Sequence, residues 1–269
     1  MRAVSRSFSS VSLESAAFGE CPGTWPLPAA EAPAEAWWRA VAAAGQGHYG
    51  QAYSELAGVR RCELDGPLRS LALSTHASLL RQLGWHGLAR GWDGRALLAA
   101  GDDVEARLDA LVGLAADALG MARFAASERL LFAARDVMAD GGHPDRAAVR
   151  VQWVSAELAM ATGHGDTALD HARRGVELAQ GQRSVRHRVK SDVVLAAALC
   201  CAGRVDDART HAEKVLDETA HHGLIPLHWA VASLLCGIGS ATRPDAEIAQ
   251  IRDAAAKLVE HRGGVWCAR

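Results

Sequence analysis

The feature that most constrains this chain is a short turn that recurs between segments rich in helix-forming residues. It runs Gly-x-x-x-x-Ala, and one weaker copy begins with Ala and ends with Ser. The copies are Gly47–Ala52, Gly84–Ala89, Ala122–Ser127, Gly163–Ala168 and Gly203–Ala208. Because glycine adopts the backbone conformation that ends a helix at little cost, each copy predicts the turn of a helical hairpin.

A second small residue lies twelve positions before the last residue of each turn. These residues are Ala40, Ala77, Ala115, Ala156 and Ala196. Two helices approach closely only where both carry small side chains, so each pair predicts the crossing point of a hairpin. A sixth, irregular copy can be drawn with Gly237 and Ala249, and the successive copies are then 37, 38, 41, 40 and 41 residues apart.

This periodicity predicts an all-α fold. The chain is 49% hydrophobic but only 5% aromatic, and its apolar residues are largely Ala, Leu and Val. Ala and Leu are the strongest apolar helix formers. One hairpin cannot bury its apolar face alone, so neighbouring hairpins must stack. We therefore expect an α-solenoid of about six antiparallel helix-turn-helix repeats.

The repeat resembles that of tetratricopeptide proteins, most closely at Gly47–Leu56, where Gly47, Tyr49 and Ala52 match the family pattern. The resemblance covers residues 34–262 and implies a TPR-like solenoid whose first helices line a concave, protein-binding face. The period exceeds the family's usual 34 residues, and the closing proline and most first-helix aromatics are missing. The longer period resembles the helical sensor domains of some bacterial transcription regulators, although the 33 residues before the repeats are too few for a DNA-binding domain.

The predicted organisation has three parts. Residues 1–33, rich in Ser, Pro and Gly, are expected to form a flexible N-terminal tail. The helical-repeat domain spans 34–262, and residues 263–269 form a C-terminal tail in which Trp266 covers the end of the core. The hairpins are predicted at 34–63, 67–100, 103–140, 145–180, 184–221 and 224–262.

Charged residues recur at equivalent places on the first helices of repeats three to five. Eighteen residues before the last residue of each turn, the sequence has Asp109, Arg150 and Lys190. The place four residues before that holds Glu105, Arg146 and Arg186. On adjacent parallel helices each set forms a row that reads acid, base, base. The acids of repeat three can neutralise the arginines of repeat four, but repeat five adds further positive charge. The excess positive charge predicts a basic groove.

The groove is the candidate partner-binding site. Trp153 shares a helix and a side with Arg150, Glu157 lies one turn further, and Arg81 projects towards the same groove from repeat two. The candidate residues are Arg81, Arg146, Arg150, Trp153, Glu157, Arg186 and Lys190. Such a groove suits an acidic peptide or a partner's carboxylate. The alternative is a solvated charged face whose cations pair with nearby Asp and Glu. Tetratricopeptide clamps for a terminal carboxylate use Asn, and this chain has none.

Two functions remain open from the sequence. The first is a cytoplasmic adaptor or regulatory scaffold that binds a peptide segment of another protein. The second is a sensing domain that binds a small anionic metabolite and acts on a separate partner. The net charge of −2 and the single short basic stripe disfavour nucleic acid. No apolar run reaches the roughly 18 residues of a membrane span. The oligomeric state is open, and the Asn-free, Ala-rich composition suggests a bacterial source.

Neither catalysis nor a cofactor is expected. The chain has no Gly-x-Ser-x-Gly elbow and no His-Glu-x-x-His motif, and its six cysteines match no zinc or disulfide spacing, which favours a reducing cytoplasm. His171 and His211 occupy equivalent places in successive second helices. A shared metal site is one interpretation, and packing repeated from hairpin to hairpin is the favoured one. We therefore predict neither a metal site nor enzymatic activity.

Overall fold

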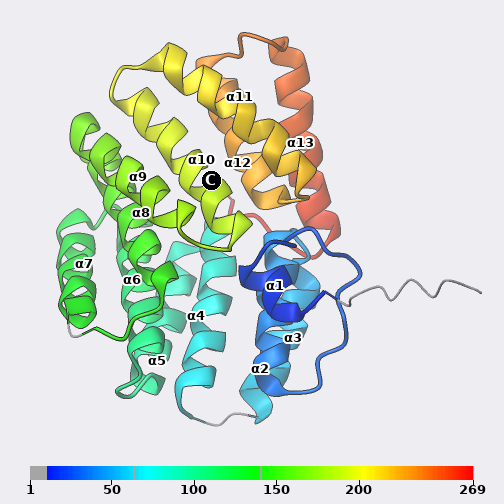
Figure 1. The fold of residues 1–269 in the computed structure, drawn as a ribbon, viewed down its shortest axis with the longest axis vertical. Helices are drawn as coiled ribbons and strands as arrows, with labels where there is room; N and C mark the ends of the chain where they lie inside the picture. Colours follow the sequence, from blue (N-terminus) through cyan, green and yellow to red (C-terminus); the bar gives the residue numbers. More distant parts are fainter. Residues whose placement is uncertain (1–10, 63–64, 140, 269) are drawn as a thin grey trace, which may run out of the picture.

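The computed structural model describes residues 11–62, 65–139 and 141–268, and these residues form thirteen α-helices (Figure 1). After α1 (Leu13–Phe18), the helices follow one another as six antiparallel hairpins. The hairpins are α2 (Pro33–Gly45) with α3 (Tyr49–Cys62), α4 (Pro67–Gln82) with α5 (His86–Ala99), α6 (Val104–Gly120) with α7 (Phe124–Ala139), α8 (Asp145–Ala161) with α9 (Gly165–Gln180), α10 (Val185–Cys201) with α11 (Val205–His221), and α12 (Ile225–Ile238) with α13 (Asp245–His261). The all-α prediction is confirmed, and each hairpin lies within one residue of its predicted bounds.

The small residues that predicted the hairpins are buried in five of the six. The first-helix positions are Ala40, Ala77, Ala115, Ala156 and Ala196, and all are 0% exposed. The turn positions Ala52, Ala89, Ser127, Ala168 and Ala208 are also 0% exposed. Interiors packed this closely leave little room for a larger side chain, so the motif reports the close approach of each helix pair.

The turns share a left-handed backbone conformation at their first residue. Gly84 and Gly163 have φ of +90° and +79°, and the weaker copy keeps this conformation without glycine, because Ala122 has φ of +57°. An L-residue with a Cβ pays about 1–2 kcal/mol for this conformation. The turn geometry of α6 and α7 is therefore imposed by the packing of the two helices.

The sixth hairpin departs from the predicted register. Gly237 is exposed and Ala249 only partly buried, whereas Leu235 and Ile248 are each 1% exposed and occupy the core. A longer connection at 239–244, which ends with Pro244 as the N-cap of α13, explains the shift. The small-residue pair drawn with Gly237 and Ala249 is therefore wrong.

The even-numbered helices form an inner layer. Within it α4 contacts α6, α6 contacts α8, and α8 contacts α10. Each odd-numbered helix from α3 to α11 packs on the inner helices that precede and follow it in the chain, and α13 packs on α12 (Figure 1). Equivalent positions on α6, α8 and α10 are thus brought side by side, as the rows of charged residues require.

The N-terminal segment differs from the predicted flexible tail. From residue 11 it packs on the helices, whereas residues 1–10 lie outside the described part of the chain. Leu13, Ala16 and Ala17 are buried, and α1 contacts both α2 and α10. Ser12 caps this short helix by accepting a hydrogen bond from the Ser15 amide at 3.1 Å. An apolar face too short to be recognised in the sequence holds the segment in place.

The last hairpin contacts the first. The Gly50 amide donates to the Arg262 carbonyl at 2.8 Å, and Val259 of α13 is fully buried in the core of the first hairpin. Beyond α13, the indole of Trp85 donates to the Val265 carbonyl at 2.7 Å, and Trp266 packs against the same core. The two ends of the helical array therefore cover each other. Among the described helices, none combines the length and hydrophobicity that a membrane span requires.

Candidate partner-binding face

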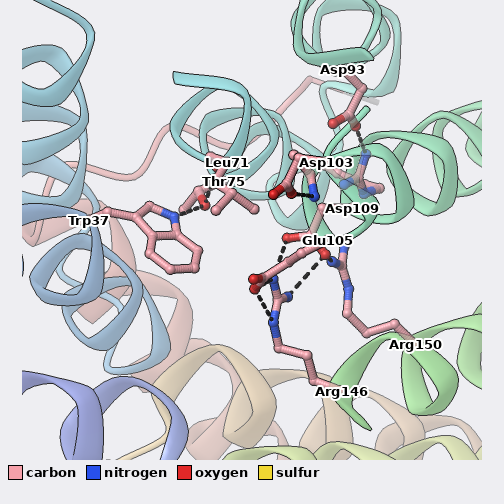
Figure 2. A network of polar contacts seen from close by, with 11 residues as sticks. Trp37, Leu71, Thr75, Asp93, Asp103, Glu105, Asp109, Arg146 and Arg150 are labelled. Atoms are coloured by element: carbon pink, nitrogen blue, oxygen red, sulfur yellow. Dashed lines mark hydrogen bonds and ion pairs between the residues drawn. The ribbon is translucent and has the colours of Figure 1, made fainter. Parts of the chain in front are cut away.

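The predicted rows of charge meet as ion pairs between α6 and α8. The guanidinium of Arg146 binds both carboxylate oxygens of Asp109, at 3.0 and 2.9 Å, and its Nε donates to Glu105 at 3.1 Å (Figure 2). Arg150 pairs with the same Asp109 carboxylate. We call these four residues the α6–α8 ladder. Bidentate contacts of this kind fix the positions of both side chains.

The α6–α8 ladder is largely buried, and its charges cancel. Burial alone would raise the pKa of Asp109, but the guanidiniums of Arg146 and Arg150 outweigh this effect and hold the pKa below its usual range. Asp109 therefore stays ionised at neutral pH. Two arginines and two carboxylates balance each other, so the ladder has no net charge to offer to a partner.

Arg81 belongs to a second buried cluster with Asp93 of α5 and Asp117 of α6. Its Nη1 donates to Asp93 at 2.9 Å and also pairs with Asp117, and both carboxylates are 0% exposed. Burial raises the pKa of Asp93 to about 7. The positive charge of Arg81 lowers this pKa, and the negative charge of Asp117 raises it. A Cβ on Gly113 would clash with the carboxylate of Asp93, so only glycine leaves room for the cluster.

Three predicted residues lie together between α8 and α10. Lys190 pairs with Glu157 at 3.2 Å, and its Nζ lies 5.8 Å from the centre of the Trp153 ring. The Trp153 indole donates to Ser191 at 2.8 Å. The side chains of Lys190 and Glu157 are both about one-third exposed, so this ion pair is more accessible than those of Arg81 and Arg150.

Arg186 of α10 is different, because it pairs with no carboxylate in the part of the chain that the structure describes. Its Nη2 donates instead to the Ala17 carbonyl of α1 at 3.3 Å. Burial and the nearby charges of Arg146 and Arg150 lower the pKa of Arg186 to about 10. Burial, followed by the charges of Arg186, Arg146 and Arg150, lowers the pKa of His187 well below its usual value and keeps that ring neutral. An excess positive charge therefore remains at the first turn of α10.

Helix α1 covers this charge with an aromatic ring. The Cζ atoms of Arg146 and Arg186 lie 5.2 and 5.9 Å from the centre of the Phe18 ring, within the range of cation–π attraction. The ring also lies 5.5 Å from that of Trp37. The Val185 amide donates to the carbonyl of the residue after Phe18, at 3.1 Å. A peptide segment thus occupies the face formed by Trp37, Arg146 and α10, which we call the α1-covered face.

The structure differs from an open basic groove in two respects. Four of the five predicted cations pair with carboxylates of this chain, and the fifth, Arg186, lies under α1. Arg81 faces its own buried acids rather than the other candidates.

Sequence reasoning identified this face incompletely. It placed Glu105 and Asp109 in the rows of charge but not in the site. It also missed Phe18 and Ala17 of α1, whose only local indication is Ser12 as a helix N-cap before an apolar residue. The residues that cover the excess charge therefore come from outside the repeats.

The paired histidines serve packing between helices. His171 contacts Gln152 at 2.8 Å and His211 contacts Asp192 at 3.1 Å, and each pair is separated by 19 residues. The contact is therefore repeated in successive hairpins, as the packing interpretation expects. Within the described ranges, no group of three or more His, Cys, Asp or Glu side chains is placed to hold a metal ion.

No protein-family model matches the chain, and a search of curated proteins gave no significant match. The charges and contacts of the inner layer are therefore the basis for assigning a function.

Proposed function

We propose that this protein is a regulatory scaffold with a TPR-like α-solenoid fold, which binds a peptide segment of a partner protein on the α1-covered face. The observation that carries this proposal is that a peptide segment already lies there. Residues 12–24 form one short capped helix and an irregular continuation. They contact α2 and α10 through the Phe18 ring and through the carbonyls of Ala17 and Gly19. The face is thus suited to peptide main chain.

The chemistry of the face indicates the kind of partner. The Phe18 ring lies between Trp37 and two arginines, and Arg186 donates to a neutral carbonyl at 3.3 Å but pairs with no carboxylate in the described part of the chain. A carboxylate in place of that carbonyl would form a charge-assisted hydrogen bond, which is roughly twice as strong as a neutral one. A segment with an aromatic residue next to an acidic one therefore binds this face better than α1 does.

In this mechanism the N-terminal segment competes with the partner. Because α1 is part of the same chain, its effective concentration at the face is high, and a partner must exceed it in affinity. Weakening α1 should consequently strengthen binding of a segment supplied from outside.

The test uses the full chain and a fluorescent peptide with the sequence of residues 12–24, in which serine replaces Cys21. Phe18→Ala removes a ring that packs on the core, and full burial of such a side chain is worth about 1.5–3 kcal/mol. The variant should therefore bind the peptide about tenfold more tightly than wild type. Adding Arg186→Ala should reverse the gain.

A matched control distinguishes the face from a general effect of charge. Arg174→Ala changes an exposed arginine of α9 that pairs with Glu177, and it should leave the affinity for the peptide unchanged. Equal affinities for Phe18→Ala and wild type would rule out the α1-covered face as the binding site.

A further inference from the structure

Arginines of α3, α4 and α5 line a pocket in the first two hairpins. The pocket, about 400 Å³ in volume, lies between the end of α3, the start of α4 and the second half of α5. Arg60, Arg69 and Arg95 line it, together with Trp92 and the apolar side chain of Leu98. It shares no residue with the α6–α8 ladder or with the Arg81 cluster.

Two of these arginines are held against one indole ring. The Cζ of Arg95 lies 4.0 Å and that of Arg60 5.0 Å from the centre of the Trp92 ring, and the His76 ring stacks on the same indole at 4.0 Å. Cation–π contacts restrict the guanidiniums while leaving their N–H edges available. Less side-chain entropy is then lost when a ligand binds.

Two arginines of this pocket, Arg60 and Arg95, differ from the arginines of the α6–α8 ladder, which pair with carboxylates. In the described ranges neither Arg60 nor Arg95 forms an ion pair. The pKa of Arg60 is lowered by burial and then by three neighbouring arginines, and the pKa of His76 falls to about 4 through burial, Arg60 and Arg95. Asp65 also lines the pocket, where its Oδ1 accepts a hydrogen bond from the next residue's amide at 2.8 Å.

We propose that this pocket binds the phosphate group of a phosphate monoester. Guanidinium groups present paired N–H donors that match phosphate oxygens, and two of them can neutralise a dianion. The volume suits a small organic phosphate. Leu98, which is 87% exposed, and the partly buried Trp92 offer apolar surface to the group that carries the phosphate. The carrier is either a small metabolite or a phosphorylated side chain of another protein.

This site is independent of the proposed peptide face, because the two share no residue. A metabolite at this pocket would support the anionic-ligand sensing function that the sequence leaves open. Failure of peptide binding at the α1-covered face leaves the phosphate site intact, and the reverse also holds.

The test measures binding of three probes to the full chain by calorimetry: inorganic phosphate, phenyl phosphate and a five-residue alanine peptide with a central phosphoserine. Wild type should bind phenyl phosphate more tightly than inorganic phosphate, and Arg60→Ala/Arg95→Ala should weaken binding at least about tenfold. Tighter binding of phenyl phosphate than of the phosphopeptide identifies a small-molecule carrier. The opposite order identifies a phosphorylated protein.

A second variant tests the pocket without removing arginines that contribute to packing. Leu98→Glu changes an exposed side chain and places a negative charge at the pocket, so it should weaken phosphate binding severalfold while leaving the melting temperature nearly unchanged. The matched control, Arg174→Ala/Arg204→Ala, removes two exposed arginines of α9 and the α10–α11 turn and should bind as wild type. Absence of saturable binding to wild type, or equal binding by wild type and Leu98→Glu, would overturn the proposal.

Discussion

Helices α8 and α10 carry arginines at equivalent positions, yet their surroundings differ. Arg146 of α8 binds Asp109 and Glu105 of α6, whereas Arg186 of α10 donates to the Ala17 carbonyl of α1 and pairs with no carboxylate of the described residues. The same residue type at the same place in the repeat is therefore paired with acids in one hairpin and lacks a carboxylate partner, among the described residues, in the next. A row of cations marks a binding face only where neighbouring helices leave the charge without an acid.

The largest expected difference between the surroundings of Arg146 and Arg186 is in the free energy of unfolding when each environment is changed. Asp109→Ala leaves Arg146 and Arg150 buried without their shared carboxylate, and should destabilise the fold by about 3–5 kcal/mol. Arg186→Met removes a buried cation that has no counter-ion in the described residues, so it should cost less than about 1 kcal/mol or stabilise. Urea unfolding of both variants measures this difference, and similar losses in the two would remove the distinction between the arginines.

The Arg81 cluster gives a pH dependence of known sign. Burial raises the pKa of Asp93 to about 7, above its value in the unfolded chain, so the folded state holds a proton that the unfolded state releases. This contribution to stability is full below the unfolded pKa and is lost as pH rises through about 7. Asp93→Asn keeps an oxygen for Arg81 but cannot ionise.

The variant should therefore become more stable relative to wild type between about pH 5 and pH 8, by on the order of 1–2 kcal/mol. Denaturant midpoints at several pH values measure the change. A stability difference that stays constant across this range would show that Asp93 is ionised throughout, like Asp109.

Two substitutions in the turns after α6 and α8, at the opposite ends of these helices from the α6–α8 ladder, give effects of backbone strain alone for comparison. Ala122→Gly relieves the left-handed conformation at the α6–α7 turn and should stabilise by about 0.5–1 kcal/mol. Gly163→Ala imposes the same strain at the α8–α9 turn, where a Cβ meets no atom within 4 Å, and should destabilise by about 1 kcal/mol. A melting temperature that changes in the same direction in Ala122→Gly and Gly163→Ala would contradict the assignment of backbone strain to Ala122.

The partly exposed ion pair between Glu157 of α8 and Lys190 of α10 should contribute least to the stability of the fold. Glu157→Gln removes the partner of Lys190, but both side chains are about one-third exposed, so the loss should be below about 1 kcal/mol. It should shrink further at high salt. A loss in urea unfolding as large as that of Asp109→Ala would mean that exposure does not distinguish these ion pairs.

The sequence predicted the hairpins well because their determinants are local. A glycine turn and two small residues twelve positions apart specify a helix crossing without reference to the rest of the chain. The sixth register was wrong because Gly237 and Ala249 match the motif by composition, while the burial of Leu235 and Ile248 depends on a longer connection. The α1 helix was missed because it is held by contacts with α2 and α10, which no local pattern reports.

The candidate site was predicted in part for the same reason. Equivalent positions on parallel helices placed Asp109 beside Arg150 and Glu105 beside Arg146, which the ion pairs confirm. The acids that satisfy Arg81 come from α5 and α6 at positions outside the rows, and so they could not be predicted. The sequence predicted which charged side chains lie next to each other on α6 and α8. It could not predict their burial or the position of α1 over them, because both depend on the tertiary structure.

Hydrogen exchange of the α1 amides tests most directly whether α1 is a displaceable segment or a part of the core. The amides of Ala16 and Gly19 donate to the carbonyls of Ser12 and Ser15, and those of α8 serve as the internal reference. If α1 is displaceable, its amides open with a free energy at least about 2 kcal/mol below that of α8, and lower still in Phe18→Ala. Exchange of α1 and α8 at the same opening free energy, in wild type and variant alike, would contradict the account.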